Sequence, residues 1–154
     1  MYKVMIYTLL SLTTLTCGRF EPAPGIVSAP EELEPYIQRY RDLKAENVGS
    51  PALNHSITVK FDDLQTGYLG VCRITTTRTG LKSETQVRVI AIDSDFWEFM
   101  SEAERLQLVL HEFGHCDLDL DHGEGGAIMN PQLIPEIDFV SNFEVLVDSL
   151  FAPR

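Results

Sequence analysis

The chain has 154 residues, enough for one domain with a substantial hydrophobic core and too few for two comfortable ones. It carries 23 Asp and Glu residues against 12 Lys and Arg, which gives a formal net charge of -11 at pH 7. So acidic a protein repels polyanions, and nucleic acid is therefore excluded as a partner. We expect a single-domain protein that is a monomer.

The first residues have the layout of a secretory signal peptide. A cationic start at Lys3 precedes an apolar run over residues 4–15, which is too short for a helix that spans a membrane. Residues 1–16 are therefore predicted to direct export and to be removed. The mature protein would then act in a bacterial cell envelope or outside the cell.

Cys17 follows the apolar run and resembles the cleavage site of bacterial lipoproteins, where the cysteine becomes lipidated. Thr14 and Thr16 depart from the usual residues before such a cysteine, so simple cleavage and secretion is the alternative. Residues 17–30 are rich in Pro and Gly without periodicity, which predicts a tether. The membrane would be a partner through this lipid anchor, and residues 31–154 would form the domain.

Three cysteines raise the question of disulfides, which exported proteins usually keep. If Cys17 is lipidated, Cys72 and Cys116 remain as the candidate pair, and a bridge between them would fasten a strand to the end of a helix. Two buried free thiols are the alternative. Cys116 is a poor metal ligand beside His115, because neighbours on a helix point about 100° apart.

Helical periodicity appears first over residues 31–46. Pro35 falls in the first turn and residues 47–51 end the pattern, so we expect a covering helix. Three segments with strand character follow and predict a small sheet: 57–61, 68–74 and 86–92.

A connector at residues 93–99 carries Trp97, which we expect in the core. Ser101 and Glu104 then match a capping box, with the serine as N-cap of a strong helix. Two faces of this helix differ in character. The core face is predicted to carry Leu106, Val109, Leu110 and Phe113, and the cleft face Leu108, His111, Glu112 and His115.

After His115 the chain loses helical character and turns back over residues 116–126. Residues 139–151 regain helical spacing and predict a closing helix that can pack under the site formed around His115. Helices that cover one small sheet indicate an α+β domain.

The segment His111-Glu112-Phe113-Gly114-His115 has the pattern HExxH. Positions i and i+4 share a helix face, so His111 and His115 can offer two imidazole nitrogens to one ion. A zinc ion with three protein ligands keeps a position for water and lowers the pKa of that water towards neutrality. Glu112 could act on it as general base and then as general acid. The pattern predicts a zinc-dependent peptidase whose peptide or protein substrate lies extended along an exposed sheet edge.

Residues 101–131 resemble the metzincin group of zinc metallopeptidases, whose motif HExxHxxGxxH is followed by a methionine turn. Ala127-Ile128-Met129-Asn130-Pro131 matches that turn. The resemblance implies a zincin-like α+β fold, with a small twisted and mostly antiparallel-edged sheet, a covering helix, an active-site helix and a C-terminal helix. It also implies one zinc ion per chain, endopeptidase activity, and Met129 as an apolar floor beneath the ligands.

The third zinc ligand departs from the family motif. The family's spacing selects Asp121, and some small secreted bacterial members use aspartate there. His122 lies one residue later and offers imidazole, a common zinc ligand, while a turn at Asp119 or Gly123 can absorb the extra residue. We take His122 as the third ligand, with Asp121 as the alternative.

Two other functions fit parts of the sequence. A non-catalytic envelope lipoprotein module could keep the metal as a structural site, although such a site has no use for Glu112 and closes its fourth position with protein. A calcium-binding surface protein could instead use the acidic residues after the motif, which are Asp117, Asp119, Asp121 and Glu124. They do not match an EF-hand, so a solvated turn is the default expectation there.

Overall fold

The computed structural model describes residues 24–64, 67–78 and 84–153. The predicted signal peptide and Cys17 lie outside the described residues. No helix within the described part of the chain has the length and apolar character needed to cross a membrane. The elements, in chain order, are β1 Ile26–Ser28, η1 Glu31–Leu33, α1 Glu34–Val48, β2 Ile57–Asp62, β3 Gly70–Arg78, β4 Glu84–Asp93, α2 Ser94–Phe99, α3 Glu102–Leu118, η2 Gly126–Met129, α4 Glu136–Ser141 and α5 Phe143–Leu150.

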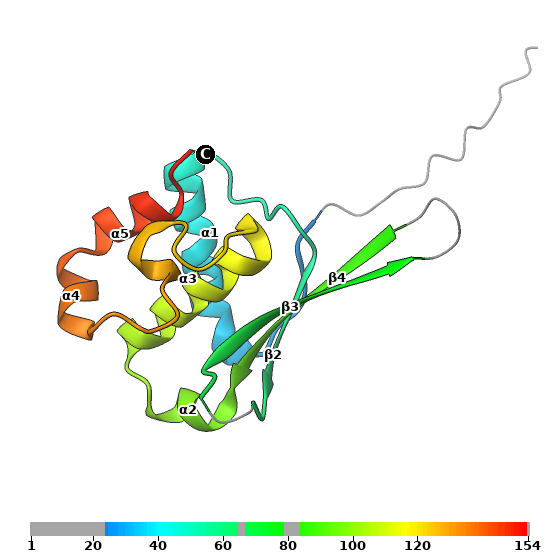
Figure 1. Ribbon diagram of the computed structural model, residues 1–154, viewed down its shortest axis with the longest axis horizontal. Helices are drawn as coiled ribbons and strands as arrows, with labels where there is room; N and C mark the ends of the chain where they lie inside the picture. The colour runs from blue at the N-terminus through cyan, green and yellow to red at the C-terminus, as the bar shows by residue number, and fades with distance from the viewer. Residues whose placement is uncertain (1–23, 65–66, 79–83, 154) are drawn as a thin grey trace, which may run out of the picture.

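The described strands form one mixed sheet in the order β1-β2-β4-β3 (Figure 1). β3 pairs with β4 antiparallel along its whole length and forms one edge of the sheet. The other two pairings, β1 with β2 and β2 with β4, are parallel. The α+β class is therefore confirmed, with antiparallel pairing at the β3 edge and parallel pairing elsewhere.

Residues 26–28, which lie within the segment expected to be a tether, form β1. Ile26 pairs with Ile57 of β2, and the Ile57 N–H donates to Gly25 O at 3.0 Å. Three residues are too few to show a strand period, so only pairing with β2 reveals this strand. The described fold thus begins before residue 31.

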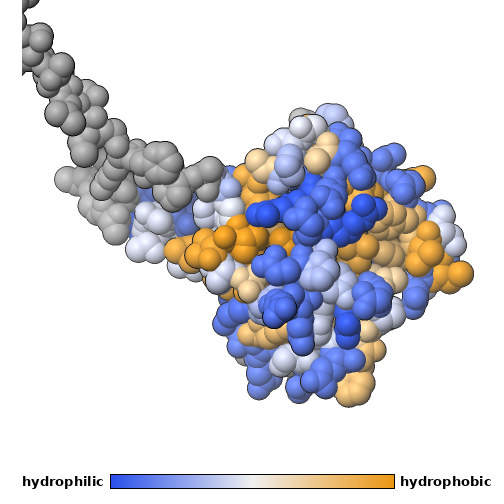
Figure 2. Space-filling model, turned by 180° about the vertical axis from the view of Figure 1, so that it is seen from behind, coloured by the Kyte–Doolittle hydropathy of each residue, from blue (hydrophilic) through white to orange (hydrophobic). Residues whose placement is uncertain are grey.

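The main helices gather on one side of the sheet, and the core lies between them and the inner sheet face (Figure 1). Alternate residues of β2 and β4 point inward, as the period of a strand requires, and Tyr40 of α1 stacks on Phe113 of α3 with ring centroids 4.5 Å apart. Seen from behind, the surface is largely hydrophilic with smaller apolar patches (Figure 2). The core includes Ile37, Tyr40, Leu43, Ile57, Val59, Ile90, Ile92, Trp97, Leu110, Phe113 and Met129.

Helix α3 begins as the sequence predicts. The Glu104 N–H donates to Ser101 Oγ at 3.3 Å and the Ser101 N–H donates to Glu104 Oε2 at 2.8 Å, so the capping box is confirmed. Burial extends beyond the predicted core face, because the cleft face also lies against the sheet. Residues 107–114 are all buried, whereas Leu106 is only partly buried.

Two segments differ from their predictions. Residues 93–99 contain helix α2, whose N-cap Asp93 accepts hydrogen bonds from the N–H groups of Asp95 and Phe96. The closing helix expected over 139–151 is two helices, α4 and α5, separated at Asn142, whose φ of -116° and ψ of 16° interrupt the helix. Helical spacing of apolar residues continues across Asn142, so periodicity alone does not reveal the break.

Candidate metal centre and cleft

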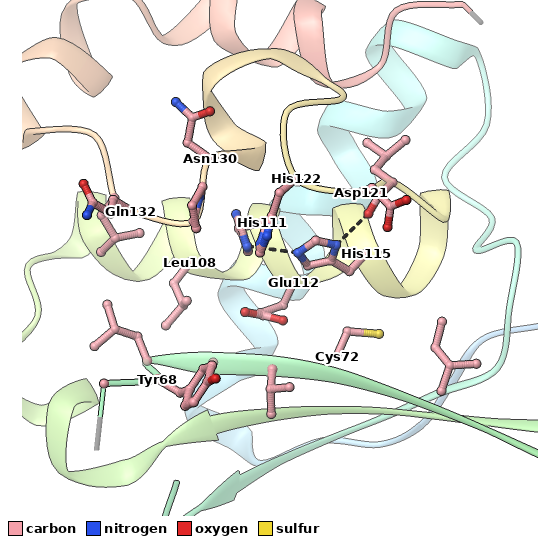
Figure 3. Close-up of a pocket in the computed structure, with 18 of the residues that line it drawn as sticks. Tyr68, Cys72, Leu108, His111, Glu112, His115, Asp121, His122, Asn130 and Gln132 are labelled. Atoms are coloured by element: carbon pink, nitrogen blue, oxygen red, sulfur yellow. Dashed lines mark hydrogen bonds between the residues drawn. The ribbon is translucent and has the colours of Figure 1, made fainter. Parts of the chain in front are cut away.

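The C-terminal half of α3 carries the HExxH residues on the side that faces β3 (Figure 3). His111 and His115 lie one turn apart, with their Nε2 atoms separated by 3.1 Å and their ring planes at 85°. His111 is buried and His115 is half-buried. The i, i+4 spacing therefore brings both rings to one spot.

The chain returns to this spot through two left-handed residues. Helix α3 ends where Asp119 takes a φ of 56° and a ψ of 36°, and Gly123 has a φ of 87°. Both had been identified as positions that could absorb an extra residue. Between them His122 turns back, with its ring centroid 5.3 and 4.8 Å from the rings of the two α3 histidines.

Three histidine nitrogens converge as a result. His111, His115 and His122 each offer one nitrogen, and the three atoms lie within 4.8 Å of one another. Within the described residues, no other group of three or more His, Cys, Asp or Glu gathers its donor atoms in this way. Asp121 is exposed and outside the group, so the structure brings His122 rather than Asp121 to the helix histidines.

Two backbone carbonyls orient the α3 histidines. His111 Nδ1 lies 2.7 Å from Ile128 O, and His115 Nδ1 lies 2.6 Å from Leu120 O. A carbonyl oxygen can only accept, so each Nδ1 carries the ring proton and donates it. In the neutral ring, Nε2 then presents a lone pair, which is the state of an imidazole that binds a metal.

The electrostatics of the pair favour a bound cation. Burial lowers the pKa of His111 to about 4 and also lowers the pKa of His115, so both rings are neutral near pH 7. Two Nε2 lone pairs then face each other across 3.1 Å. Such an arrangement is repulsive unless a cation lies beside both atoms. The donor set therefore fits a transition metal ion of the kind that imidazole nitrogens bind.

Glu112 lies in a buried position between α3 and β3 (Figure 3). The backbone N–H of Cys72 bonds to its carboxylate, and Oε2 has no hydrogen-bond partner among the described residues. A Cβ at Gly70 would come within 2.8 Å of Oε1, so the glycine leaves room for the carboxylate. Burial raises the pKa of Glu112 to about 8, against the smaller opposite effect of the Cys72 bond. A desolvated carboxyl beside metal donors is suited to proton transfer.

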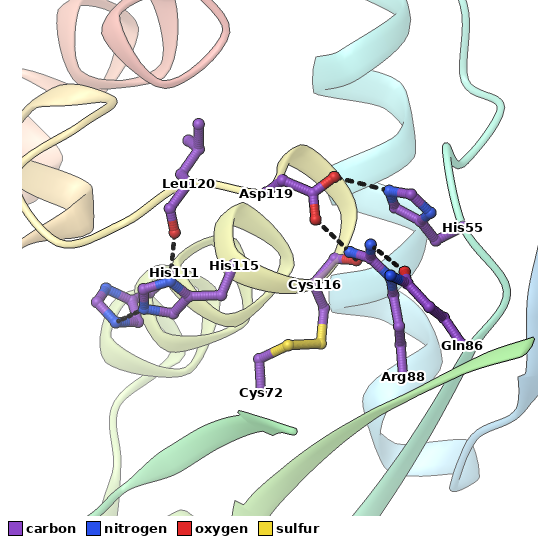
Figure 4. The surroundings of a disulfide bond; sticks show 9 residues. All are labelled: His55, Cys72, Gln86, Arg88, His111, His115, Cys116, Asp119 and Leu120. Atoms are coloured by element: carbon purple, nitrogen blue, oxygen red, sulfur yellow. Dashed lines mark hydrogen bonds and ion pairs between the residues drawn. A yellow bond between two sulfur atoms is a disulfide. The ribbon is translucent and has the colours of Figure 1, made fainter. Parts of the chain in front are cut away.

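Cys72 and Cys116 form a disulfide, with their Cα atoms 5.6 Å apart (Figure 4). The bridge joins β3 to the last turn of α3, and the free-thiol alternative is wrong. The two cysteines are 44 residues apart in the sequence. A disulfide that closes a loop of this length typically stabilises a fold by about 2–4 kcal/mol. The disulfide thus holds the strand that contacts Glu112 against the helix that carries it.

Met129 ends η2 and is fully buried. It packs on Gly114 of α3, where a Cβ would overlap Met129 Sδ. The preceding residue, Ile128, supplies the carbonyl that orients His111. The segment therefore supports the helix and orients a ring, while its assignment as a metzincin methionine turn stays a prediction.

The histidines and Glu112 open into a cleft of about 1180 Å³. β3 forms one wall of the cleft (Figure 3), and it is the outer strand of the sheet. Apolar side chains, amides and one tyrosine complete the lining. They include Tyr68, Leu69, Ile74, Leu108, Leu120, Asn130, Gln132 and Leu133.

The acidic residues after the motif do not gather into one site. Asp117 is fully buried and accepts hydrogen bonds from Tyr40 Oη at 2.7 Å and from Lys44 Nζ at 2.6 Å. Asp119 pairs instead with Arg88. The solvated turn expected here is therefore wrong for Asp117, because a buried lysine supplies its counter-charge. The calcium alternative finds no convergent oxygen donors among the described residues.

Several residues that build the site carry no local signal in the sequence. Gly70 and Gly114 make room for Glu112 and Met129, which lie elsewhere in the chain. Arg88 reaches the end of α3 from β4. Each acts on a partner that only the folded chain brings near, so spacing patterns cannot identify them.

An α+β fold whose HExxH helix meets a third histidine above an open cleft defines a metallopeptidase-like protein. The sequence model of the family described as "Putative phage metallopeptidase" matches residues 31–133, which is more than half of the chain. The chain therefore belongs to this family. A search of curated proteins and a search of solved structures found no match to this chain.

His122→Ala is expected to weaken Zn²⁺ binding by about 100-fold or more, since removal even of an outer partner commonly costs about 10–100-fold. Asp121→Ala should leave the affinity nearly unchanged, because Asp121 is exposed and outside the convergent group. Competition with a chromophoric chelator measures both dissociation constants. Equal losses in the two variants would contradict the assignment of His122.

Proposed function

We propose that this protein is a zinc-dependent endopeptidase in which His111, His115 and His122 hold the metal and Glu112 is the general base. The observation that carries the proposal is the meeting of three imidazole nitrogens within 4.8 Å, beside a buried carboxylate with an unpartnered oxygen. Membership of a metallopeptidase family supports it.

Zinc fits the donor set. Imidazole nitrogens bind zinc at about 2.0–2.1 Å, so two of them on one tetrahedral ion lie about 3.3 Å apart. The Nε2 atoms of His111 and His115 are 3.1 Å apart. Bound there, zinc would polarise the scissile carbonyl and increase the acidity of the attacking water.

Glu112 would take the proton from the attacking water and deliver it to the leaving amine. Burial raises the pKa of Glu112 to about 8 in the metal-free protein, and a bound divalent cation nearby would favour the carboxylate form that accepts a proton. Oε2 is available for the proton, while the Cys72 N–H holds the carboxylate towards β3. One carboxylate can therefore serve as base and then as acid.

We propose β3 as the strand along which the substrate lies. β3 is the outer strand of the sheet, and residues 70–72 and 74 line the cleft beside the histidines. A peptide that pairs with its free edge gains main-chain hydrogen bonds and is held extended across the site. The sequence does not specify which sheet edge binds the substrate, and the sheet topology supports the β3 edge.

A purely structural metal site is the rival. Structural zinc sites are closed by four protein ligands. Among the described residues no fourth His, Cys, Asp or Glu donor joins the three histidines, and Glu112 lies beside them with a buried oxygen that has no hydrogen-bond partner. This arrangement favours the catalytic alternative.

We also propose that the protein is exported to a bacterial envelope, by the signal at residues 1–16 and with a lipid on Cys17. The Cys72–Cys116 disulfide supports export, because disulfides persist mainly in oxidising compartments.

Metal removal tests the proposed function. Dialysis against 1,10-phenanthroline is expected to abolish cleavage of casein, and added Zn²⁺ should restore it, because water activation requires the ion. Elemental analysis should find about one zinc per chain in the active protein, as expected for one three-histidine catalytic site. Full cleavage by metal-free protein would contradict the proposal, and Mg²⁺ in place of Zn²⁺ is the control.

A further inference from the structure

A network of polar contacts ties the end of α3 to the sheet beside the disulfide (Figure 4). Arg88 of β4 is buried, and its Nη1 donates to Cys116 O at 2.9 Å and to Asp119 Oδ1 at 2.6 Å. Its Nη2 donates to Gln86 Oε1 at 2.8 Å. His55 Nε2 lies 2.9 Å from Asp119 Oδ2. We call Arg88, Asp119 and His55 the Arg88 clamp.

The clamp holds a backbone conformation that L-residues disfavour. Among the described residues other than glycine, only Asp119 has a positive φ. Both of its carboxylate oxygens are engaged, one by the sheet through Arg88 and one by the loop before β2 through His55. The left-handed turn is therefore fixed from outside the helix.

The turn at Asp119 decides where two parts of the metal centre lie. Leu120 N donates to Gly114 O at 3.0 Å, and Leu120 O accepts from His115 Nδ1 at 2.6 Å. His122 follows two residues later and joins the other histidines. A different backbone conformation at Asp119 would move the Leu120 carbonyl, which orients His115. It would also move the His122 ring relative to the other two histidines.

We propose that Arg88, acting through Asp119, is a positioning residue that sets the metal affinity of the three-histidine site. The inference rests on the proposed function, because it concerns the same metal. The disulfide at Cys116 keeps α3 attached to β3 when the clamp is removed. Loss of the clamp therefore changes the direction of the chain after the helix rather than the place of the helix.

Three substitutions separate the clamp from general folding. Arg88→Met keeps an apolar stem and removes the donors, and Asp119→Gly allows the left-handed turn but removes the carboxylate. Asp119→Asn keeps an oxygen acceptor and tolerates the left-handed turn, so it is the conservative rescue. Arg78→Met, which removes an exposed arginine of β3, is the matched control.

The readouts are the Zn²⁺ dissociation constant of the purified protein and the visible absorption spectrum of its Co²⁺ form. Arg88→Met and Asp119→Gly are expected to weaken Zn²⁺ binding by about 10–100-fold and to alter the Co²⁺ spectrum, as loss of outer-shell support does. Asp119→Asn and Arg78→Met should match the wild type. Circular dichroism checks that each variant is folded. If Arg88→Met does not fold, the comparison of Asp119→Gly with Asp119→Asn tests the proposal by itself.

Wild-type affinity and spectrum in folded Asp119→Gly would overturn the route through Asp119, whatever Arg88→Met shows. Equal losses in Asp119→Gly and Asp119→Asn would overturn the role of the side-chain acceptor. A wild-type protein without measurable Zn²⁺ affinity would instead overturn the proposed function, and this inference with it.

Discussion

Glu112→Gln is expected to lower kcat/KM for peptide hydrolysis by about 10²–10⁴-fold while Zn²⁺ stays bound. The amide has nearly the shape of the carboxylate but cannot accept a proton from water. Glu112 does not belong to the group of converging histidines, so metal affinity should change little. The loss should appear mainly in kcat, because the base acts in the transition state.

The substitution also separates activity from stability. The buried Glu112 carboxylate has an oxygen without a partner among the described residues, and its charged form is disfavoured by desolvation. Glutamine carries no charge, so the thermal midpoint of the metal-free variant should equal or exceed that of the wild type.

Glu98→Gln, at an exposed residue of α2 outside the cleft lining, is the matched control and should retain full activity. Peptide cleavage followed by chromatography measures the rates, and elemental analysis measures bound zinc. General base catalysis usually contributes about 10²–10⁴-fold to the rate. If Glu112→Gln keeps an activity within about tenfold of wild type, Glu112 is not the base.

Asp117→Ala is expected to lower the free energy of unfolding by about 3–5 kcal/mol, because it leaves a buried cation without its partner. The Asp117 carboxylate is fully buried and accepts from Lys44 Nζ at 2.6 Å, from Tyr40 Oη and from the Asn54 N–H. Burial and the Asp117 charge raise the pKa of Tyr40, which keeps its phenol a donor. One substitution thus removes the shared acceptor of three donors, of which, among the described residues, only Lys44 Nζ keeps another hydrogen bond, to Asn54 Oδ1 at 3.1 Å.

Urea denaturation of the metal-free protein measures this loss. Glu84→Ala is the matched control. It removes the exposed ion pair between Glu84 and Arg78, whose N···O distance of 2.6 Å equals that of the buried Lys44–Asp117 pair. An exposed pair contributes about 0–1 kcal/mol, so the control should unfold almost like the wild type. Similar losses in the two variants would show that the burial of Asp117 and Lys44 does not matter.

Predictions from short sequence patterns agree with the structure where the interaction itself is short-ranged. The capping box at Ser101 and Glu104 forms because both partners lie within one helical turn. The rings of His111 and His115 meet because i, i+4 spacing alone puts them on one helix face. The turn positions Asp119 and Gly123 follow from residue types that tolerate a positive φ.

Predictions that depended on distant partners were less complete. The strand at Ile26–Ser28 exists only because it pairs with β2, and the break at Asn142 is hidden by continuous apolar spacing. Asp117 was expected in a solvated turn because nothing in its neighbourhood shows the lysine 73 residues away. In each case the deciding contact lies outside any local window.

The sequence by itself determined the helix with His111, Glu112 and His115 on a common face, the candidate disulfide pair, and the acidic net charge. These follow from residue type and from the fixed periods of helix and strand. Only the tertiary structure decided that His122 joins the site, that β3 is the outer strand beside it, and that Arg88 holds the turn at Asp119. Those features require the return path of the chain over α3 and the order of strands in the sheet, and both depend on contacts between residues far apart in the chain.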